Sequence, residues 1–215
     1  MAMERHLDAL NWRYAVKKFD PERSLTAEQV DGLKRAFNLT ATSYGLQPIQ
    51  LVVLRHKTLQ EELVAHSYGQ RQVADASHLL IFCIEKAVDS AYIEAYFNRV
   101  REVRGTSGEI LDPYRRELQQ RFRGKPSEEV RIWATHQAYL AMGNLLTYCA
   151  FERIDSCPME GFDPEAYDRV LGLEDRGLTA VLAMPVGYRS PEDIFSGFKK
   201  VRRKLERSVY TIEEK

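Results

Sequence analysis

Three short apolar runs constrain the fold of this chain most. "IQLVVL" covers residues 49–54, "LLIFCI" covers 79–84 and "TAVLAMPVG" covers 179–187. Each run is rich in branched residues and too short for a buried helix, so each predicts a central strand. The stretches between the runs have mostly helical patterns. The sequence therefore predicts an α+β fold, in which helices surround a small central sheet of mixed strand direction.

The segment "RYAVKKFD" (13–20) follows a predicted first helix. Leu7 and Leu10 fit that helix, and the Asp20–Pro21 step disfavours helix because proline restricts the residue before it. We therefore expect residues 13–20 to run from the helix into a turn. Hydrophobic spacing alone allows the cations of this segment to face water or to hold a ligand.

Two further helices are marked by clear patterns. Thr26 and Gln29 form a capping-box pair, which starts a helix with apolar residues at helical spacing. Segment 128–154 is apolar around most of its circumference and predicts a core helix. With 215 residues the chain is long enough to bury roughly 70% of its unfolded surface. This length allows one large domain or two small ones.

The charge balance and the cysteines limit the partners and the compartment. Lys plus Arg and Asp plus Glu each number 31, so no net field attracts nucleic acid or an anionic membrane, and neither partner is expected. The odd, scattered cysteines, 83, 149 and 157, make a poor disulfide framework and indicate a reducing compartment. The N-terminus has no signal-peptide core and no apolar run reaches ~20 residues, so a cytoplasmic protein is expected.

Neither common backbone cradle for a nucleotide phosphate occurs in the sequence. No G-x-G-x-x-G follows a strand and no G-x-x-x-x-G-K-[ST] is present, so a phosphate would need side-chain cations. Candidate cations lie far apart, as Arg13 with Lys17 and Lys200 with Arg202. Four such groups could hold one phosphate dianion if the fold brought them together. Each pair alone fits a solvated surface equally well.

Two other short motifs could carry a site. "CPMEGFD" (157–163) places Glu160 and Gly161 at a turn, where glycine lets backbone amides approach a ligand, although an ordinary turn also explains it. "DASH" (75–78) sets His78 near Asp75, which suits acid–base work or a capped helix-to-strand junction. The other histidines lack metal spacing. We assign no nucleophile and no metal.

Several of these segments, in order, resemble the FMN-dependent nitroreductases. "RYAVKKFD" is similar to their Arg-x-Ser-x-Lys-x-Phe-Asp opening, and "TSYGLQPIQLVVL" is similar to their Ser-x-x-x-Gln-Pro stretch before a strand. The similarity continues through "LTAEQVDGLKRAF", "DASHLLIFC", "AYLAMGNLLTYCAFERIDSCPMEGFD", "AVLAMPVGYRSPED" and "KKVR". It is strongest to the oxygen-insensitive NAD(P)H nitroreductase and dihydropteridine reductase branch, and weakest over residues 91–130.

The resemblance implies a single domain over residues 1–215, with an FMN site built by the cations and the glycine turn. It implies that Lys200, Arg202 and Arg13 bind the phosphate and that Lys17 lies near the ribityl chain and the pyrimidine edge. It also implies that the turn lines the isoalloxazine, with the N–H groups of Glu160 and Gly161 facing the ring; the turn residues are Pro158, Met159, Glu160 and Gly161.

A polar loop and the C-terminal tail carry the implied homodimer. The family's Pro-Ser-Ser-x-Asn loop, which reaches the flavin of the other subunit, reads Ala41 to Gly45 here. Thr42 and Ser43 keep hydroxyl groups, whereas Gly45 has no amide side chain. The tail "SVYTIEEK" (208–215) is implied to pair with the partner's sheet as an exchanged strand, although a frayed end is the other interpretation.

Two positions depart from the family pattern. Ala15 replaces a serine and removes a hydroxyl donor, and Gln72 replaces a lysine that stabilises the anionic reduced flavin. Gln70 or Arg71 could substitute for that lysine. Without a substitute, the midpoint potential of the flavin is expected to be low.

The implied activity is a ping-pong oxidoreduction. NADH or NADPH reduces the flavin, and a small-molecule electron acceptor such as a nitroaromatic or a quinone then reoxidises it. No side chain is assigned a catalytic role. The alternatives are a specialised flavin, dihydropteridine or enone reductase, and a protein that binds FMN without turnover.

Overall fold

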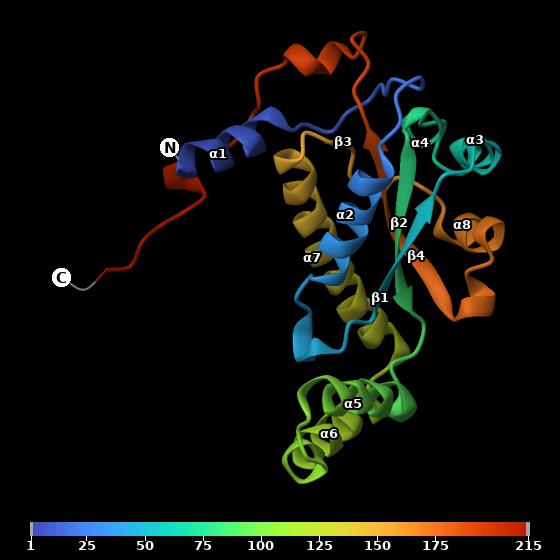
Figure 1. The fold of residues 1–215 in the computed structure, drawn as a ribbon, viewed down its shortest axis with the longest axis vertical. Helices are drawn as coiled ribbons and strands as arrows, with labels where there is room; N and C mark the ends of the chain where they lie inside the picture. Colours follow the sequence, from blue (N-terminus) through green and yellow to red (C-terminus); the bar gives the residue numbers. More distant parts are fainter. Residues whose placement is uncertain (1, 214–215) are drawn as a thin grey trace.

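The computed structural model describes residues 2–213 and contains one four-stranded sheet in the order β1-β2-β4-β3 (Figure 1). The strands are β1 (Ile49–Leu54), β2 (His78–Glu85), β3 (Asp155–Ser156) and β4 (Leu178–Gly187). The three apolar runs of the sequence form β1, β2 and β4, which confirms the α+β prediction. β3 is a short edge strand beside β4.

The strand directions differ from the mixed sheet that was expected. All three ladders between named strands are antiparallel, and the described parallel pairing is an isolated bridge between Ala15 and Ser156. An apolar run indicates that a strand is buried, but it does not encode the direction of the neighbouring strand. No strand forms in the tail up to residue 213, so strand exchange stays a prediction.

Helices cover both faces of the sheet. In Figure 1, α2 and α7 lie on one side of the strands, and α3 and α8 lie on the other. None of the helices in residues 2–213 is long and apolar enough to cross a membrane. The helices are α1 (Ala2–Trp12), α2 (Ala27–Asn38), α3 (Lys57–Ala65), α4 (Gln72–Asp75), α5 (Ser90–Arg104), α6 (Gly108–Arg123), α7 (Ser127–Phe151) and α8 (Pro164–Leu171).

β2 forms the centre of the core because its alternate side chains enter two apolar clusters. One set packs toward α3 and α8, and the other packs toward α2 and α7, as expected for the two-residue period of a strand. The first set is Leu79, Ile81 and Cys83, and the second is Leu80, Phe82 and Ile84.

α7 is the predicted core helix, and it begins and ends close to the expected residues. Its inner face packs against β2 and β4 with fully buried residues such as Ala138 and Leu145. Its outer face is also apolar, but there the side chains of Ile132, Tyr139 and Leu140 are between 44% and 53% exposed. One chain therefore covers only part of the apolar surface of this helix.

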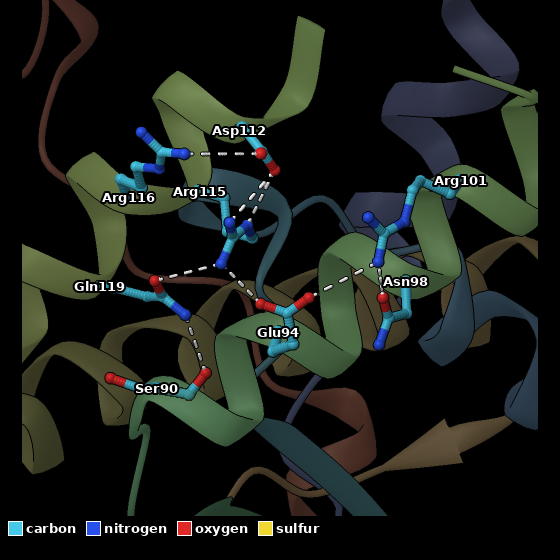
Figure 2. Close-up of polar contacts among 8 residues, drawn as sticks. All are labelled: Ser90, Glu94, Asn98, Arg101, Asp112, Arg115, Arg116 and Gln119. Atoms are coloured by element: carbon cyan, nitrogen blue, oxygen red, sulfur yellow. Dashed lines mark hydrogen bonds and ion pairs between the residues drawn. The ribbon is translucent and has the colours of Figure 1, made fainter. Parts of the chain in front are cut away.

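α5 and α6 form an arm that projects beyond the end of the sheet (Figure 1). A charge network joins the two helices (Figure 2): the Arg115 guanidinium lies 2.7 Å from a Glu94 oxygen and 3.2 Å from an Asp112 oxygen. Gln119 adds a 3.2 Å bond to the Ser90 carbonyl. Because Arg115 is only 19% exposed, these pairs are better shielded from water than isolated surface pairs.

The "DASH" segment forms the predicted junction between α4 and β2, and it places His78 in a buried environment. His78 Nδ1 lies 2.9 Å from Ser77 Oγ. Burial, followed by repulsion from Arg55, Lys57 and Lys34, lowers the pKa of His78 to about 4. The imidazole is therefore neutral in the folded protein at pH 7.

This buried histidine predicts a loss of stability in mild acid. The unfolded chain takes up a proton at His78 near pH 6.5, whereas the folded chain resists protonation down to about pH 4, so the free energy of unfolding falls across that window. A His78→Gln variant should lose several degrees less in Tm between pH 7 and 4.5 than the unchanged protein. The exposed His136→Gln is the matched control; equal pH slopes for all three proteins would contradict the assignment.

Candidate functional site

Residues 13–20 form an extended strap along the edge of the sheet. Ala15 bridges Ser156 of β3, and Phe19 bridges Arg189 just after β4. Val16 and Phe19 are fully buried, whereas Lys17 is exposed and Arg13 is half-buried. The apolar residues of the strap thus enter the core and leave its three cations, Arg13, Lys17 and Lys18, wholly or partly at the surface, as its amphipathic pattern predicts.

A stacked cluster fixes the residues on either side of Arg13. The Arg189 guanidinium lies 4.4 Å from the Trp12 ring centre and 4.5 Å from the Tyr14 ring centre. Asp155 accepts bonds of 2.8 Å from Arg189 N and Nε. This buried ion pair holds the end of α1 and the start of the strap against β3.

Asp193 holds the middle of the strap through backbone hydrogen bonds. One of its carboxylate oxygens accepts from Tyr14 Oη at 3.0 Å, from Lys17 N at 2.9 Å and from Lys18 N at 3.2 Å. Burial alone would raise its pKa, but these donors and Phe195 N outweigh burial and keep the pKa of Asp193 below the usual value. The carboxylate therefore stays ionised at neutral pH and determines the position of Lys17.

Three of the four predicted cations come together at the end of α1. The pKa of Arg13 is lowered by burial and by repulsion from Arg202, and that of Lys200 is lowered by burial and by both arginines. Lys200 Nζ donates to the carbonyls of Leu10 and Arg13, which caps the end of α1. Within residues 2–213, no carboxylate forms an ion pair with any of the three cations.

Arg13 also has an unsatisfied donor. Its Nε is buried without a hydrogen-bond partner, a condition that costs about 1–3 kcal/mol in a folded protein. Mutually repelling cations and a buried free donor fit a bound anion, because a phosphate supplies both the charge and the acceptor. Lys17 lies further along the strap, with its Nζ 3.7 Å from Cys157 Sγ.

The turn after β3 presents two free backbone donors. Met159 is fixed by a two-way bridge to Ala183, with N···O distances of 2.8 and 3.0 Å, and its buried side chain packs in the core. Phe162 N donates to Glu160 O at 3.0 Å, which closes a three-residue turn around Gly161. In the described chain, the N–H groups of Glu160 and Gly161 have no acceptor.

Gln70, in the loop before α4, contacts this turn, and Gln72, the first residue of α4, contacts Gln70. Gln72 Nε2 donates to Gln70 Oε1 at 2.9 Å, and Gln70 Nε2 donates to Gly161 O at 2.8 Å. Gln72 is only 5% exposed, and its amide also reaches the Cys157 thiol. Both glutamines therefore belong to the same site as the turn.

Neither suggested substitute supplies the charge that Gln72 lacks. The Arg71 guanidinium binds Glu61 and lies 2.9 Å from Asp75, and its side chain is 53% exposed. Gln70 is uncharged and its amide is engaged by Gly161. Neither residue therefore places a charge beside Gln72, but Lys17 lies close by, because its Nζ is 3.7 Å from the Cys157 sulfur that the Gln72 amide also reaches.

The polar loop lies apart from the other predicted site residues. Ser43–Gly45 form a short 3-10 turn at the end of the molecule near α5 and α6, far from the strap (Figure 1). Ser43 N donates to Gln137 Oε1 at 2.9 Å, and Thr42 Oγ1 accepts from Gln47 N at 3.0 Å. A side chain at position 45 would collide with Tyr96 Oη. One chain does not bring Thr42, Ser43 and Gly45 to the cations.

Sequence reasoning missed the residues that hold the strap. Asp193 bonds to a backbone group 176 positions away, and Asp155 bonds to Arg189 34 positions away. No local pattern marks such pairs. The available signal is that Asp193 ends "YRSPED" (188–193), which belongs to a segment that resembles the nitroreductases.

The fold and the site together define an α+β protein that combines a cluster of side-chain cations with a turn whose amides are free, and both features suit a phosphate-bearing ligand. The model of the Nitroreductase family matches residues 10–188. The chain belongs to this family.

Individual relatives agree with this membership. The oxygen-insensitive NAD(P)H nitroreductase of Salmonella typhimurium is 31% identical over 209 residues, which is 92% of this chain and 94% of the relative. A nitroreductase-like protein from Streptococcus mutans has the same fold, with a TM-score of 0.84, 24% identity and coverage of 98% and 100% of the two chains. A nitroreductase-type structure from Exiguobacterium sibiricum, in complex with FMN, has a TM-score of 0.80 at 16% identity. The match covers 96% of this chain and 97% of that one.

Proposed function

We propose that this protein is an FMN-dependent oxidoreductase that uses NADH or NADPH to reduce small acceptors such as nitroaromatics or quinones. The observation that carries the proposal is the site itself: three cations that have no carboxylate partner among residues 2–213, the free Arg13 Nε, and two free N–H groups at one turn. The Salmonella relative, which matches over nearly the whole chain, supports the same activity.

The cations are the residues that would bind the phosphate. Arg13 and Arg202 can form charge-assisted and partly bidentate bonds with phosphate oxygens. Lys200 has one N–H left beside the two that its carbonyl partners use. Lys17, held by Asp193 on the strap, would contact the ribityl chain and the pyrimidine edge.

The turn and the glutamines would bind and orient the ring. Glu160 and Gly161 offer backbone donors, whereas Pro158 and Met159 contribute mainly backbone surface. Ala15, Gln70 and Gln72 complete the pocket on the side of the strap and α4. FMN, when bound, supplies the chemistry of accepting a hydride and passing electrons to the acceptor. The side chains of this chain bind and orient, and none is given an acid–base role.

A second subunit would complete the site in a homodimer. Thr42, Ser43 and Gly45 lie away from the cations of their own chain, so they could reach only the flavin of a partner. The apolar outer face of α7 and the exposed apolar residues of the tail, such as Leu205, provide surface for such a partner. We place this dimer in the cytoplasm.

The first test is the visible spectrum of the purified protein with each nicotinamide. We expect a yellow protein with one FMN per chain that bleaches on anaerobic mixing with NADH or NADPH and regains colour with a quinone or a nitroaromatic. Colour that persists with both donors would indicate a flavin binder without turnover. Bleaching that only a pterin, an enone or free flavin reverses would indicate a specialised reductase.

The second test removes the phosphate cations. Arg13→Ala combined with Arg202→Ala should yield folded, colourless protein, because losing two charge-assisted bonds of about 1.5–3 kcal/mol each weakens binding at least ~100-fold. FMN titration by fluorescence quenching measures the loss. Arg203→Ala, next in sequence to Arg202, is the control and should keep full flavin. If the double variant retains full flavin as well, the phosphate site lies elsewhere.

The third test addresses the tail and the dimer. Deleting residues 209–215 should weaken the dimer in sedimentation and lower the Tm, because an exchanged strand would contribute hydrogen bonds and buried apolar area. Deleting only residues 213–215 is the control. An unchanged dimer and an unchanged Tm after the longer deletion would exclude strand exchange.

A further inference from the structure

We infer that Gln70 is a positioning residue: by clamping the Gly161 carbonyl, it fixes the Gly161–Phe162 peptide, whose N–H bonds to Glu160 O, and so the direction in which the free Gly161 N–H projects. The consequence for the flavin rests on the proposed function, whereas the clamp itself is a property of the protein alone. The inference follows from how each polar group of the turn is used.

The hydrogen bonds of the turn leave only the two projecting donors free. Phe162 N and Glu160 O bond to each other at 3.0 Å, and Gly161 O accepts from Gln70 Nε2 at 2.8 Å. Without the bond from Gln70, the peptide between Gly161 and Phe162 would be held on one side only. The Glu160 N–H lies on the peptide whose Met159 carbonyl accepts from Ala183 N at 3.0 Å, so the bridge to β4 holds it. The Gly161 N–H lies on the peptide whose carbonyl accepts from Phe162 N, so the bond from Gln70, in the loop before α4, supports its orientation.

Gln72 determines which end of the Gln70 amide faces the turn. Its Nε2 donates to Gln70 Oε1 at 2.9 Å, so the oxygen of Gln70 faces Gln72 and the nitrogen faces Gly161. The reversed amide would place two oxygen atoms against each other at the turn and two nitrogen atoms at Gln72. The buried Gln72 amide therefore orients the Gln70 amide, and the Gln70 amide in turn donates to the turn. Both side chains are uncharged.

Glycine at position 161 allows this close approach. A Cβ atom there would lie 3.1 Å from Gln70 Nε2, which is closer than ordinary van der Waals contact. A larger residue would push the amide of Gln70 away from the carbonyl. The clamp and the glycine thus form one unit.

The clamp can be tested without flavin by hydrogen–deuterium exchange. Gln70→Met keeps the side-chain volume and removes both bonds, so the amide of Phe162, whose bond to Glu160 O closes the turn, should exchange several-fold faster in the flavin-free variant. Gln70→Glu, which retains an acceptor for Gln72 but loses the donor to Gly161, should do the same. Arg71→Gln is the control, since Arg71 contacts Glu61 and Asp75 instead. Unchanged exchange in both Gln70 variants would overturn the inference.

The effect on the ligand is measured with FMN itself. Losing one hydrogen bond of about 0.5–1.5 kcal/mol should weaken FMN binding about threefold to tenfold in Gln70→Met, and the visible spectrum of bound FMN should shift. Arg71→Gln should have the same FMN affinity and the same visible spectrum of bound FMN as the unchanged protein. Equal affinity and an equal spectrum in Gln70→Met would show that the clamp is structural only and overturn its positioning role. Faster exchange in a protein whose unchanged form binds no FMN would support the clamp and refute the proposed function.

Discussion

Two buried carboxylates hold the strap on which the whole site depends. Asp155 and Asp193 accept hydrogen bonds from groups on the strap and after β4, and they tie residues 13–20 to the edge of the sheet. Neither carboxylate pairs with the cations at the end of α1, so the strap is positioned without neutralising the charge that the site presents. The two carboxylates have other partners, so the cations at the end of α1 keep their charge for a ligand.

This arrangement trades local stability for binding. Burial and repulsion from Arg202 lower the pKa of Arg13, burial and both arginines lower that of Lys200, and Arg13 keeps a buried donor without an acceptor. An anion that bound in the cluster would offset the repulsion between the cations and would also accept a hydrogen bond from Arg13 Nε. Any ligand that binds the folded state alone also shifts the folding equilibrium toward that state. Ligand-free protein is therefore expected to be less stable than loaded protein.

The sequence predicted the helices and strands better than it predicted the contacts between them. The strands over residues 49–54 and 79–84, the capped helix after Thr26 and the core helix α7 follow from local patterns, because burial and capping leave a period or a pair in the sequence. The role of Arg71 in the site could not be predicted. Whether Arg71 replaces the charge missing at Gln72 depends on its contacts with Glu61 and Asp75, and helix periodicity does not reveal such contacts.

Lys200 gives the site a basis for choosing among ligands by charge. Its ammonium lies on the carbonyls of Leu10 and Arg13, whose lone pairs would otherwise repel an approaching anion. A neutral ligand cannot compete for this ammonium, and it would meet the carbonyl groups without gaining a strong contact. A dianion shares the ammonium and gains the nearby guanidinium groups as well. A flavin that ends in a hydroxyl group should therefore be rejected even where its ring fits the turn equally well.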